Sequence, residues 1–381
     1  MTLDELQSKV IDYIRFPLAV GIVWIHTAGA INVDTIQQID LNVVTGDKVY
    51  AILTIIFAKL IFLAAVPLFF IISGYYYFYN VKSWGRGEYV RKTKSRLKSL
   101  VIPYFIWNAI AFSIAVAQGL FIYYSKGETG SIMSQLGSVD GWLKPFWNQW
   151  QYGPIQNILG TEYYITFPYI GALWFLRDLI TISLLSPVIY LFVKYTKIWG
   201  LVLLFIALYT NIWIHIPGFG IEVFFYFSLG AYLGVSKKNM LQLARKVKIP
   251  ALVLCLLALF FAAYGTPSFF PFVVPIRLSI LIFVITMCIT SLNIVAALIE
   301  NKKIEINNFL SKTTFFIFAA HGLVLSALNI AFRYVFSSDT IFVKVSQFII
   351  SPIVVVIVCI LGYYILHKIT PRLLSILVGS R

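Results

Sequence analysis

Long apolar runs are the feature that most constrains the fold of this chain. Its 381 residues are only 12% charged, whereas soluble domains carry about 25% charged residues. A transmembrane helix needs about 20 mostly apolar residues. The sequence contains ten such runs, at 13–31, 50–79, 99–124, 168–193, 198–216, 219–235, 249–265, 272–299, 313–336 and 345–368. It therefore predicts an all-α polytopic membrane protein with about ten transmembrane helices, and it excludes a soluble enzyme, a disordered chain and a nucleic-acid-binding domain.

The distribution of basic residues predicts which side of the membrane each loop faces. With ten spans both termini lie on one side, and that side holds 22 of the 30 Lys and Arg residues. Cytoplasmic loops of membrane proteins carry the excess of Lys and Arg, so we expect cytoplasmic N- and C-termini. The first apolar run is expected to remain as an uncleaved anchor, because no small-residue cleavage site follows it.

Two loops stand out within what we expect to be a single membrane domain, 1–381, without a fused soluble domain. Segment 82–98 is strongly basic and is expected to be a cytoplasmic loop. Segment 125–167 is the longest connection, is rich in Trp and Tyr, and is expected to lie outside. Such aromatic residues either bind sugars or mark the membrane interface.

The cysteines do not indicate a metal or disulfide framework. Cys255, Cys288 and Cys359 lie far apart in apolar runs, which predicts packing roles. No Cys-x-x-Cys pair, Walker loop or His-Glu-x-x-His motif is present. We therefore expect no bound metal or cofactor.

Arg15 and His26 lie eleven positions apart in the first predicted span. Eleven residues make three helical turns plus about 20°, so both side chains share one helix face. The rise of about 16 Å places Arg15 at the cytoplasmic boundary and His26 near mid-membrane. This arrangement suits a long substrate with an anionic head and a reactive end inside the membrane. Alternatively, Arg15 reaches to lipid headgroups and His26 is a hydrogen-bonded packing residue.

His321 and Asp178 are also titratable groups within predicted spans. His321 lies about as deep in its span as His26, within about 6 Å at 1.5 Å per residue. A histidine can act as a base at neutral pH, and a carboxylate such as Asp178 can orient it. The alternative for Asp178 is a structural ion pair with Arg177 or with another span.

Other polar residues have two interpretations each. Glu222 and Arg277 lie near the outer surface, where they either pair with each other or contact an external acceptor. Ser73-Gly74 at the end of the second span favours close helix packing over a nucleophilic serine. The basic residues of one further stretch either bind a diphosphate or fix the topology; they are Arg91, Lys94, Arg96 and Lys98.

Several motifs follow one another in a recognisable order. The Arg-x10-His pair comes first, followed by a Phe69–Tyr75 segment ending in Ser-Gly-Tyr, a basic stretch before Pro103-Tyr104, Trp174-Phe175-Leu176, and Phe318-Ala319-Ala320-His321. Together they resemble the acyltransferase-3 family of integral-membrane acyltransferases. One departure is that Arg91-x-x-Lys94 stands where members often carry Arg-x-x-Arg, and lysine lacks the bidentate fork of arginine.

The resemblance implies a donor, an acceptor and roles for the residues. The donor would be a cytoplasmic acyl-CoA, most often acetyl-CoA, with its phosphates held by Arg15 and the basic stretch. The acceptor would be a sugar hydroxyl of an envelope polysaccharide or lipid-linked glycan, and the location would be the bacterial cytoplasmic membrane. His26 would be the general base or a transient acyl carrier, and His321 and Asp178 would orient groups or stabilise charge. The candidates for acceptor contact are Trp174, Glu222 and Arg277.

Two other functions remain open from the sequence. One is a transporter or flippase for a glycan or lipid, which acyl-CoA consumption would distinguish from an enzyme. The other is a non-enzymatic subunit of a polysaccharide synthesis complex, in which His26 would be dispensable. The sequence predicts neither the acceptor's identity nor the oligomeric state.

Overall fold

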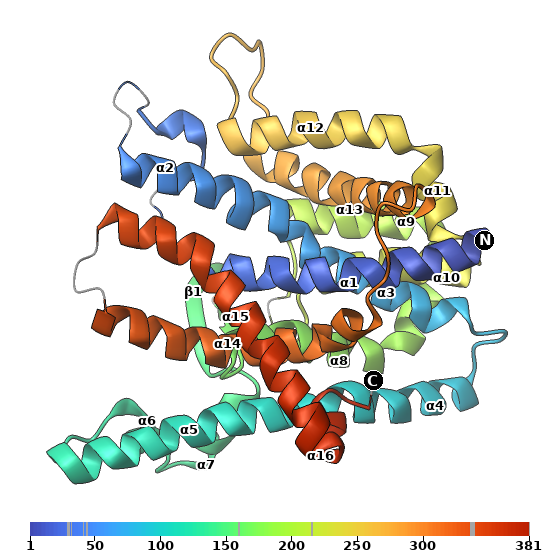
Figure 1. The fold of residues 1–381 in the computed structure, drawn as a ribbon. Coiled ribbons are helices and arrows are strands. Elements are labelled where there is room, and N and C mark those ends of the chain that lie inside the picture. Colours follow the sequence, from blue (N-terminus) through green and yellow to red (C-terminus); the bar gives the residue numbers. More distant parts are fainter. Residues whose placement is uncertain are drawn as a thin grey trace.

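The computed structural model describes residues 1–28, 31, 33–40, 42, 45–158, 161–214, 216–335 and 340–380. The chain is 79% helical, which confirms the predicted helical class. Most long helices run side by side in one bundle (Figure 1). The N-terminus and the basic helix α4 lie at one end of this bundle, and α2 lies at the other end (Figure 1).

The helices differ in length, and two pairs of them are joined by π-helical or 3-10 segments. Their bounds are α1 Leu3–Thr27, α2 Gly46–Leu53, α3 Ala65–Tyr79, α4 Arg86–Arg96, α5 Ile102–Lys126, α6 Ser131–Gln135, α7 Val139–Leu143, α8 Trp174–Leu184, α9 Ser186–Thr210, α10 Ile221–Val235, α11 Met240–Lys246, α12 Lys248–Tyr264, α13 Ile276–Glu300, α14 Asn308–Val335, α15 Ile341–Ile369 and α16 Pro371–Leu377. A π-helical segment, Thr54–Leu60, and a 3-10 turn, Ile61–Ala64, connect α2 to α3, and a second π-helical segment, Leu97–Val101, connects α4 to α5.

Within the described residues, seven helices are long and apolar enough to cross a membrane, or eight if the bent pair α11 and α12 forms one span. The predicted number of ten is not confirmed. The differences lie at the fourth to sixth predicted spans, where the helices are short or broken. Helix α10 has only 15 residues, and Lys197, at φ 52°, breaks the helical backbone within α9.

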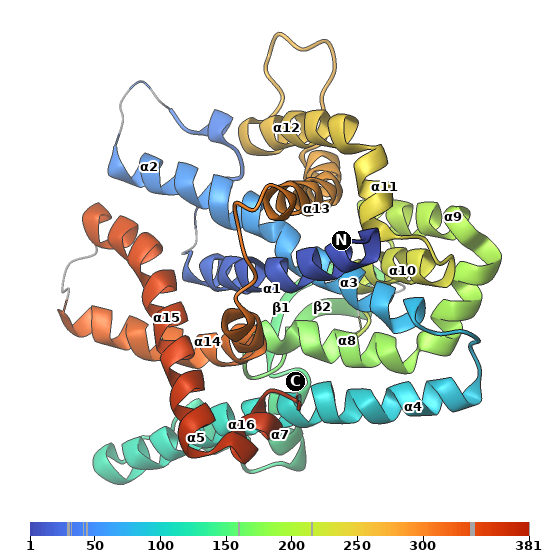
Figure 2. The ribbon, with the colours of Figure 1, turned by 45° about the vertical axis from the view of Figure 1, so that its right-hand side comes forward.

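The predicted basic loop at 82–98 is mostly helical, because α4 occupies residues 86–96. Together with α5 it forms a helical stretch of 41 residues, basic in its first part and apolar after it. This stretch is about 60 Å long. A bilayer core is only about 30 Å thick, so a helix of this length extends beyond it. Tyr89 on α4 donates a hydrogen bond to the carbonyl of Leu184 at 3.2 Å, and α4 lies beside α8 (Figure 2).

The predicted outer loop at 125–167 carries regular structure that the sequence did not suggest. It contains α6, α7 and an antiparallel hairpin of β1 (Trp150–Ile158) and β2 (Thr161–Phe167). Two of its Trp side chains donate hydrogen bonds to backbone carbonyls within the segment or directly after it. Trp142 donates to the carbonyl of Leu136 at 3.1 Å, and Trp150 donates to that of Tyr169 at 3.0 Å.

Helices α3 and α10 pack at unusually short range through glycines. A Cβ atom on Gly74 would lie 2.1 Å from the carbonyl oxygen of Phe227, and one on Gly230 would lie 2.0 Å from that of Ile71. Small residues permit such backbone contact between membrane helices. The packing role expected of this segment is therefore confirmed for Gly74.

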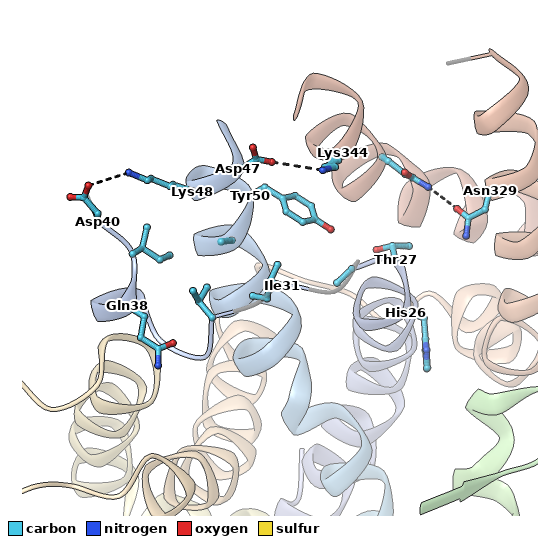
Figure 3. Close-up of a pocket in the computed structure, with 15 residues that line it drawn as sticks. His26, Thr27, Ile31, Gln38, Asp40, Asp47, Lys48, Tyr50, Asn329 and Lys344 are labelled. Carbon is cyan, nitrogen blue, oxygen red and sulfur yellow. Dashed lines mark hydrogen bonds and ion pairs between the residues drawn. The ribbon is translucent and has the colours of Figure 1, made fainter. Parts of the chain in front are cut away.

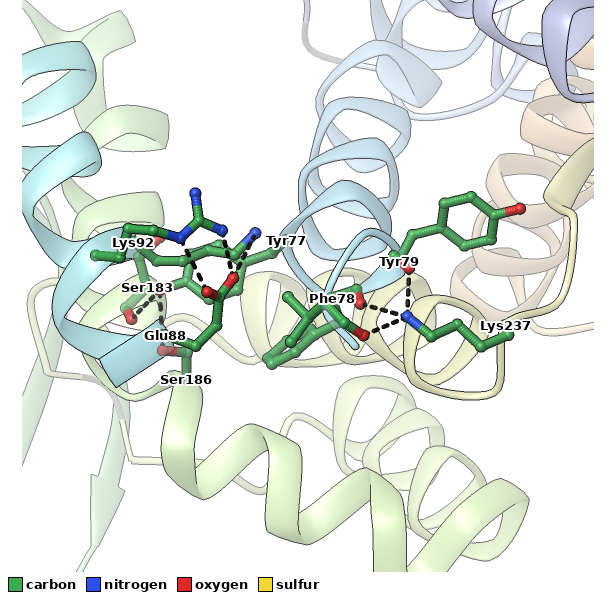
Figure 4. A network of polar contacts seen from close by, with 10 residues as sticks. Tyr77, Phe78, Tyr79, Glu88, Lys92, Ser183, Ser186 and Lys237 are labelled. Carbon is green, nitrogen blue, oxygen red and sulfur yellow. Dashed lines mark hydrogen bonds and ion pairs between the residues drawn. The ribbon is translucent and has the colours of Figure 1, made fainter. Parts of the chain in front are cut away.

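The end of α3 is fixed by a lysine from the turn after α10. Lys237 donates to three backbone oxygens, those of Phe78, Tyr79 and Val81 (Figure 4). Carbonyls in the last turn of a helix have no partner within that helix, and a cation is favourable there. Lys237 thus connects α10 to the end of its packing partner α3.

The three cysteines have free thiols, and all are buried. Cys288 on α13 lies 3.8 Å from the carbonyl oxygen of Ala64. The predicted packing positions are confirmed.

Candidate active site

Two histidines meet between α1 and α14. The ring centroids of His26 and His321 lie 5.2 Å apart, with an interplanar angle of 37°. This contact confirms that the two side chains have nearly the same depth in the bundle. It also places His26 on the face of α1 that packs against α14.

The hydrogen bonds of His321 define its tautomer. Its Nδ1 lies 2.7 Å from the carbonyl oxygen of Phe318 and 3.2 Å from that of Ile317. A carbonyl oxygen can only accept, so Nδ1 carries the hydrogen and the neutral ring has its lone pair on Nε2. The ring is fully buried, and Nε2 has no hydrogen-bond partner among the described residues.

His26 opens onto a cavity of about 750 Å³ at the Thr27 end of α1. His26 is one of the residues that line this cavity, at its border with Thr27 (Figure 3). The walls come from α2, α14 and α15 as well as from the segment after α1, and they include Tyr50, Asn329 and Gln347. We call this space the His26 cavity.

Arg15 lines a second cavity, of about 480 Å³, toward the other end of α1. We call it the Arg15 cavity. Arg96 and Lys312 add two more cations to its wall, while Arg15 itself pairs with Asp12 at 3.0 Å. Arg96 is also held by a 3.4 Å bond to Ser73 Oγ.

Phe318 connects the Arg15 cavity to the histidines. It lines this cavity, and its ring centroid lies 6.2 Å from that of His321. His26, in contact with His321, lines the other cavity. The histidine pair therefore stands between the two cavities.

The basic stretch contributes one of its four predicted residues to the Arg15 cavity. That residue is Arg96. Arg91 instead pairs with Glu88, and its side chain is 69% exposed. Lys94 and Lys98 are exposed and lie outside the wall of this cavity.

Asp178 is not brought to the histidines. Its Oδ1 accepts a bond of 2.9 Å from Arg177 Nε, and both side chains are about 95% buried. Arg177 also donates to the carbonyls of Trp147 and Thr166 at 2.8 and 3.0 Å. This geometry corresponds to the structural ion pair that was the alternative interpretation of Asp178.

The three residues considered for acceptor contact share a third cavity with Asp178. Trp174, Glu222 and Arg277 line this space of about 500 Å³, which neither histidine lines. Arg277 donates to the carbonyl of Leu208 at 2.8 Å and to Asn211 Oδ1 at 3.3 Å. No ion pair within 4 Å joins Glu222 and Arg277, both of which the structure describes.

Comparison with protein-family models gives one result. A model described as an acyltransferase domain, that of the acyltransferase-3 family, matches residues 9–367. The chain belongs to the acyltransferase-3 family. The match covers nearly the whole chain and includes Arg15, His26 and His321. Comparisons with curated proteins and with solved structures gave no significant match.

Sequence reasoning missed several residues of this membrane acyltransferase that line the two cavities. Lys312 begins the apolar part of α14, and Asn329 and Gln347 interrupt apolar stretches of α14 and α15. Gln347 Nε2 donates to Asn329 Oδ1 at 2.8 Å. The available signal was their polarity inside predicted spans, which is costly in a membrane.

Proposed function

We propose that this acyltransferase is an O-acyltransferase of the bacterial cytoplasmic membrane. It transfers an acyl group, most often acetyl, from cytoplasmic acyl-CoA to a sugar hydroxyl of an envelope polysaccharide or a lipid-linked glycan. The observation that carries the proposal is the position of His26 and His321 between a cation-lined cavity and a polar cavity. A reaction between one anionic and one hydroxylic substrate requires such a meeting point.

The Arg15 cavity is the proposed donor site. Three cations, on Arg15, Arg96 and Lys312, face it from three helices, and arginine pairs well with phosphate oxygens. Arg15 lies about 16 Å along α1 from His26. The pantetheine arm of acyl-CoA would extend over this distance, with the phosphates at Arg15 and the thioester at the histidines. In this proposal the Arg15 end of the bundle, with both termini, faces the cytoplasm.

His26 is the proposed general base. It takes the proton of the acceptor hydroxyl as the oxygen attacks the thioester carbonyl carbon. The carbon–sulfur bond then breaks, and the CoA thiolate receives that proton from the imidazolium, so that an ester and free CoA remain. Transient acylation of His26 is the alternative order of the same steps.

His321 is proposed to position His26. Its protonated Nδ1 is held by backbone carbonyls, and its Nε2 can only accept. A ring nitrogen of His26 that donates to this Nε2 would leave the other His26 nitrogen free as the base. Asp178 would act only on the structure, through Arg177.

The test is acyl transfer by the purified protein in liposomes, with labelled acetyl-CoA and a panel of glycans. Wild type is compared with His26→Ala and with the control His367→Ala, whose ring stacks on Tyr363 away from the cavities. Loss in His26→Ala alone, with unfolding temperature retained, supports the proposal. Equal activity in all three removes His26 from catalysis. If none of them binds or turns over acyl-CoA, the result contradicts the proposal and favours a transporter or a non-enzymatic subunit.

A further inference from the structure

The His26 cavity has the size and lining of a ligand site. Its volume of about 750 Å³ lies within the range of about 300–1,000 Å³ for small-molecule sites. His26 forms one end, and two ion pairs lie at the opposite end (Figure 3). A substrate bound in this cavity would contact the proposed base directly.

Among the described residues, the positive and negative side chains that line this cavity form two ion pairs. Lys48 Nζ lies 3.7 Å from Asp40 Oδ2, and Lys344 Nζ lies 3.8 Å from Asp47 Oδ1. Each carboxylate that lines the cavity thus has a cation beside it. Within the described residues, the Arg15 cavity has three cations and no carboxylate in its wall, so the two cavities favour ligands of different charge.

The remaining polar groups of the His26 cavity are neutral donors and acceptors. Asn329 and Gln347 form an amide pair at 2.8 Å, which uses one donor and one acceptor of the two amides. Primary amides carry two donors and an acceptor oxygen each, so the pair can bind further hydroxyl groups. Tyr50 adds a phenol to the lining of the same cavity.

We infer that the His26 cavity binds the acceptor, and that the acceptor's reacting end is an uncharged, polyhydroxylated group held by Asn329 and Gln347. The inference rests on the proposed function and specifies its acceptor side. It assigns the acceptor to a different cavity from the one that Trp174, Glu222 and Arg277 line. A neutral sugar ring has the required chemistry, because it presents several hydroxyls and no charge.

The test uses release of CoA from acetyl-CoA in liposomes, with and without methyl glycosides. Methyl glucoside and methyl N-acetylglucosaminide are the neutral probes, and methyl glucuronide is the anionic probe. We expect saturable stimulation by a neutral glycoside and a half-saturating concentration about tenfold or more higher for the anionic one. Removal of a site's hydrogen-bonding groups weakens polar ligands strongly. The double variant Asn329→Ala/Gln347→Ala should therefore raise the half-saturating concentration of the neutral glycoside about tenfold or more, with an unchanged KM for acetyl-CoA.

A matched amide pair provides the control. Gln135 and Gln149 exchange two bonds, of 2.9 and 3.0 Å, and line none of the three cavities. The double variant Gln135→Ala/Gln149→Ala should leave the half-saturating concentration of the glycoside unchanged.

Three outcomes would overturn the inference. The first is a preference for the glucuronide. The second is a higher half-saturating concentration of the glycoside in Trp174→Ala and an unchanged one in Asn329→Ala/Gln347→Ala. This result would assign the acceptor to the third cavity. The third is release of CoA that depends on His26 but is not stimulated by any glycoside. This outcome would exclude a sugar as the acceptor, while the proposed reaction of His26 with acyl-CoA would still hold. Absence of CoA release from wild type would instead contradict the proposed function itself.

Discussion

The ring of His321 lies 5.2 Å from the ring of His26, but only His26 reaches a cavity. His321 is closed off by the surrounding helices and bonded at Nδ1 to the carbonyl of Phe318. In the proposed mechanism, His321 therefore acts through His26.

Substitution of His321 with Asn should lower kcat and leave substrate binding nearly unchanged. An Asn amide can still donate to the Phe318 carbonyl, but it has no acceptor in the place of Nε2. We expect kcat to fall by about tenfold or more, with KM for acetyl-CoA within about twofold, because no phosphate contact changes.

Steady-state kinetics of the purified variant measure both values. His367→Asn serves as the control, since it removes a histidine of α15 that stacks on Tyr363. A rise in KM with an unchanged kcat would show that His321 supports the donor cavity and not the base.

Arg96 and Arg91 lie on the same helix, but their expected effects on the donor differ. Arg96 lines the Arg15 cavity and bonds to Ser73, whereas Arg91 is exposed and pairs with Glu88. Loss of a charge-assisted bond to phosphate typically costs about 1.5–3 kcal/mol. Arg96→Ala should thus raise KM for acetyl-CoA about 10- to 100-fold, and Arg91→Ala should change it less than about twofold.

Acetyl-pantetheine, which lacks the nucleotide and its diphosphate, distinguishes a phosphate contact from a general defect. Wild type should prefer acetyl-CoA strongly over this shorter donor, and Arg96→Ala should lose much of that preference. Equal KM changes for both donors would assign Arg96 a structural role.

Helix periodicity and depth were sufficient to place Arg15 and His26 on one face of α1 and His321 at a similar depth. The contact between the two histidines also requires that α1 and α14 be neighbours. Arg15 and His26 share a face of α1 by their spacing, and both lie toward α14, where Arg15 shares a cavity with Lys312 and His26 contacts His321. The amide pair of Asn329 and Gln347 could not be predicted in the same way. It depends on which helices are neighbours, and periodicity within one helix does not contain that information.

The basic stretch shows the same limit. Helix α4 is polar on nearly all sides, so no apolar face indicates which of its cations docks against α3. The span count differs for another reason. Lys197 breaks α9 in the gap between the predicted spans 168–193 and 198–216, and α8 and α10, with 11 and 15 residues, are too short to be counted as spans. The environment of the Arg177–Asp178 pair could not be predicted either, because Arg177 takes its other partners from residues earlier in the chain, the carbonyls of Trp147 and Thr166.

The ion pair of Arg177 and Asp178 should be essential for stability and not for chemistry. Removal of one partner from a buried pair leaves an uncompensated charge and costs about 3–5 kcal/mol. We expect Asp178→Asn to lower the unfolding temperature in detergent markedly, and the double variant Arg177→Met/Asp178→Leu to recover part of the loss.

The activity of the folded fraction separates this interpretation from a catalytic one. Activity per folded Asp178→Asn molecule, counted by size-exclusion chromatography, should stay within about threefold of wild type. A loss comparable to that of His26→Ala in well-folded protein would restore Asp178 to the catalytic group.

Gly74 is a position at which a single added methyl group should destabilise the protein. Its Cβ would lie 2.1 Å from the backbone oxygen of Phe227, and a backbone atom cannot rotate away as a flexible side chain can. Gly74→Ala must therefore separate α3 from α10, and overpacking of this kind typically costs about 1–3 kcal/mol. The control is Gly87→Ala on exposed α4, where an added Cβ meets nothing within 4 Å and alanine favours the helix by about 1 kcal/mol. Unfolding temperatures measured in one detergent should fall for Gly74→Ala and stay unchanged or rise for Gly87→Ala.

The packing of α3 against α10 should also affect donor binding. Because Arg96 is bonded to Ser73 beside this interface, Gly74→Ala should raise KM for acetyl-CoA. An unchanged KM in a destabilised protein would show that the donor cavity does not depend on the packing of α3 against α10.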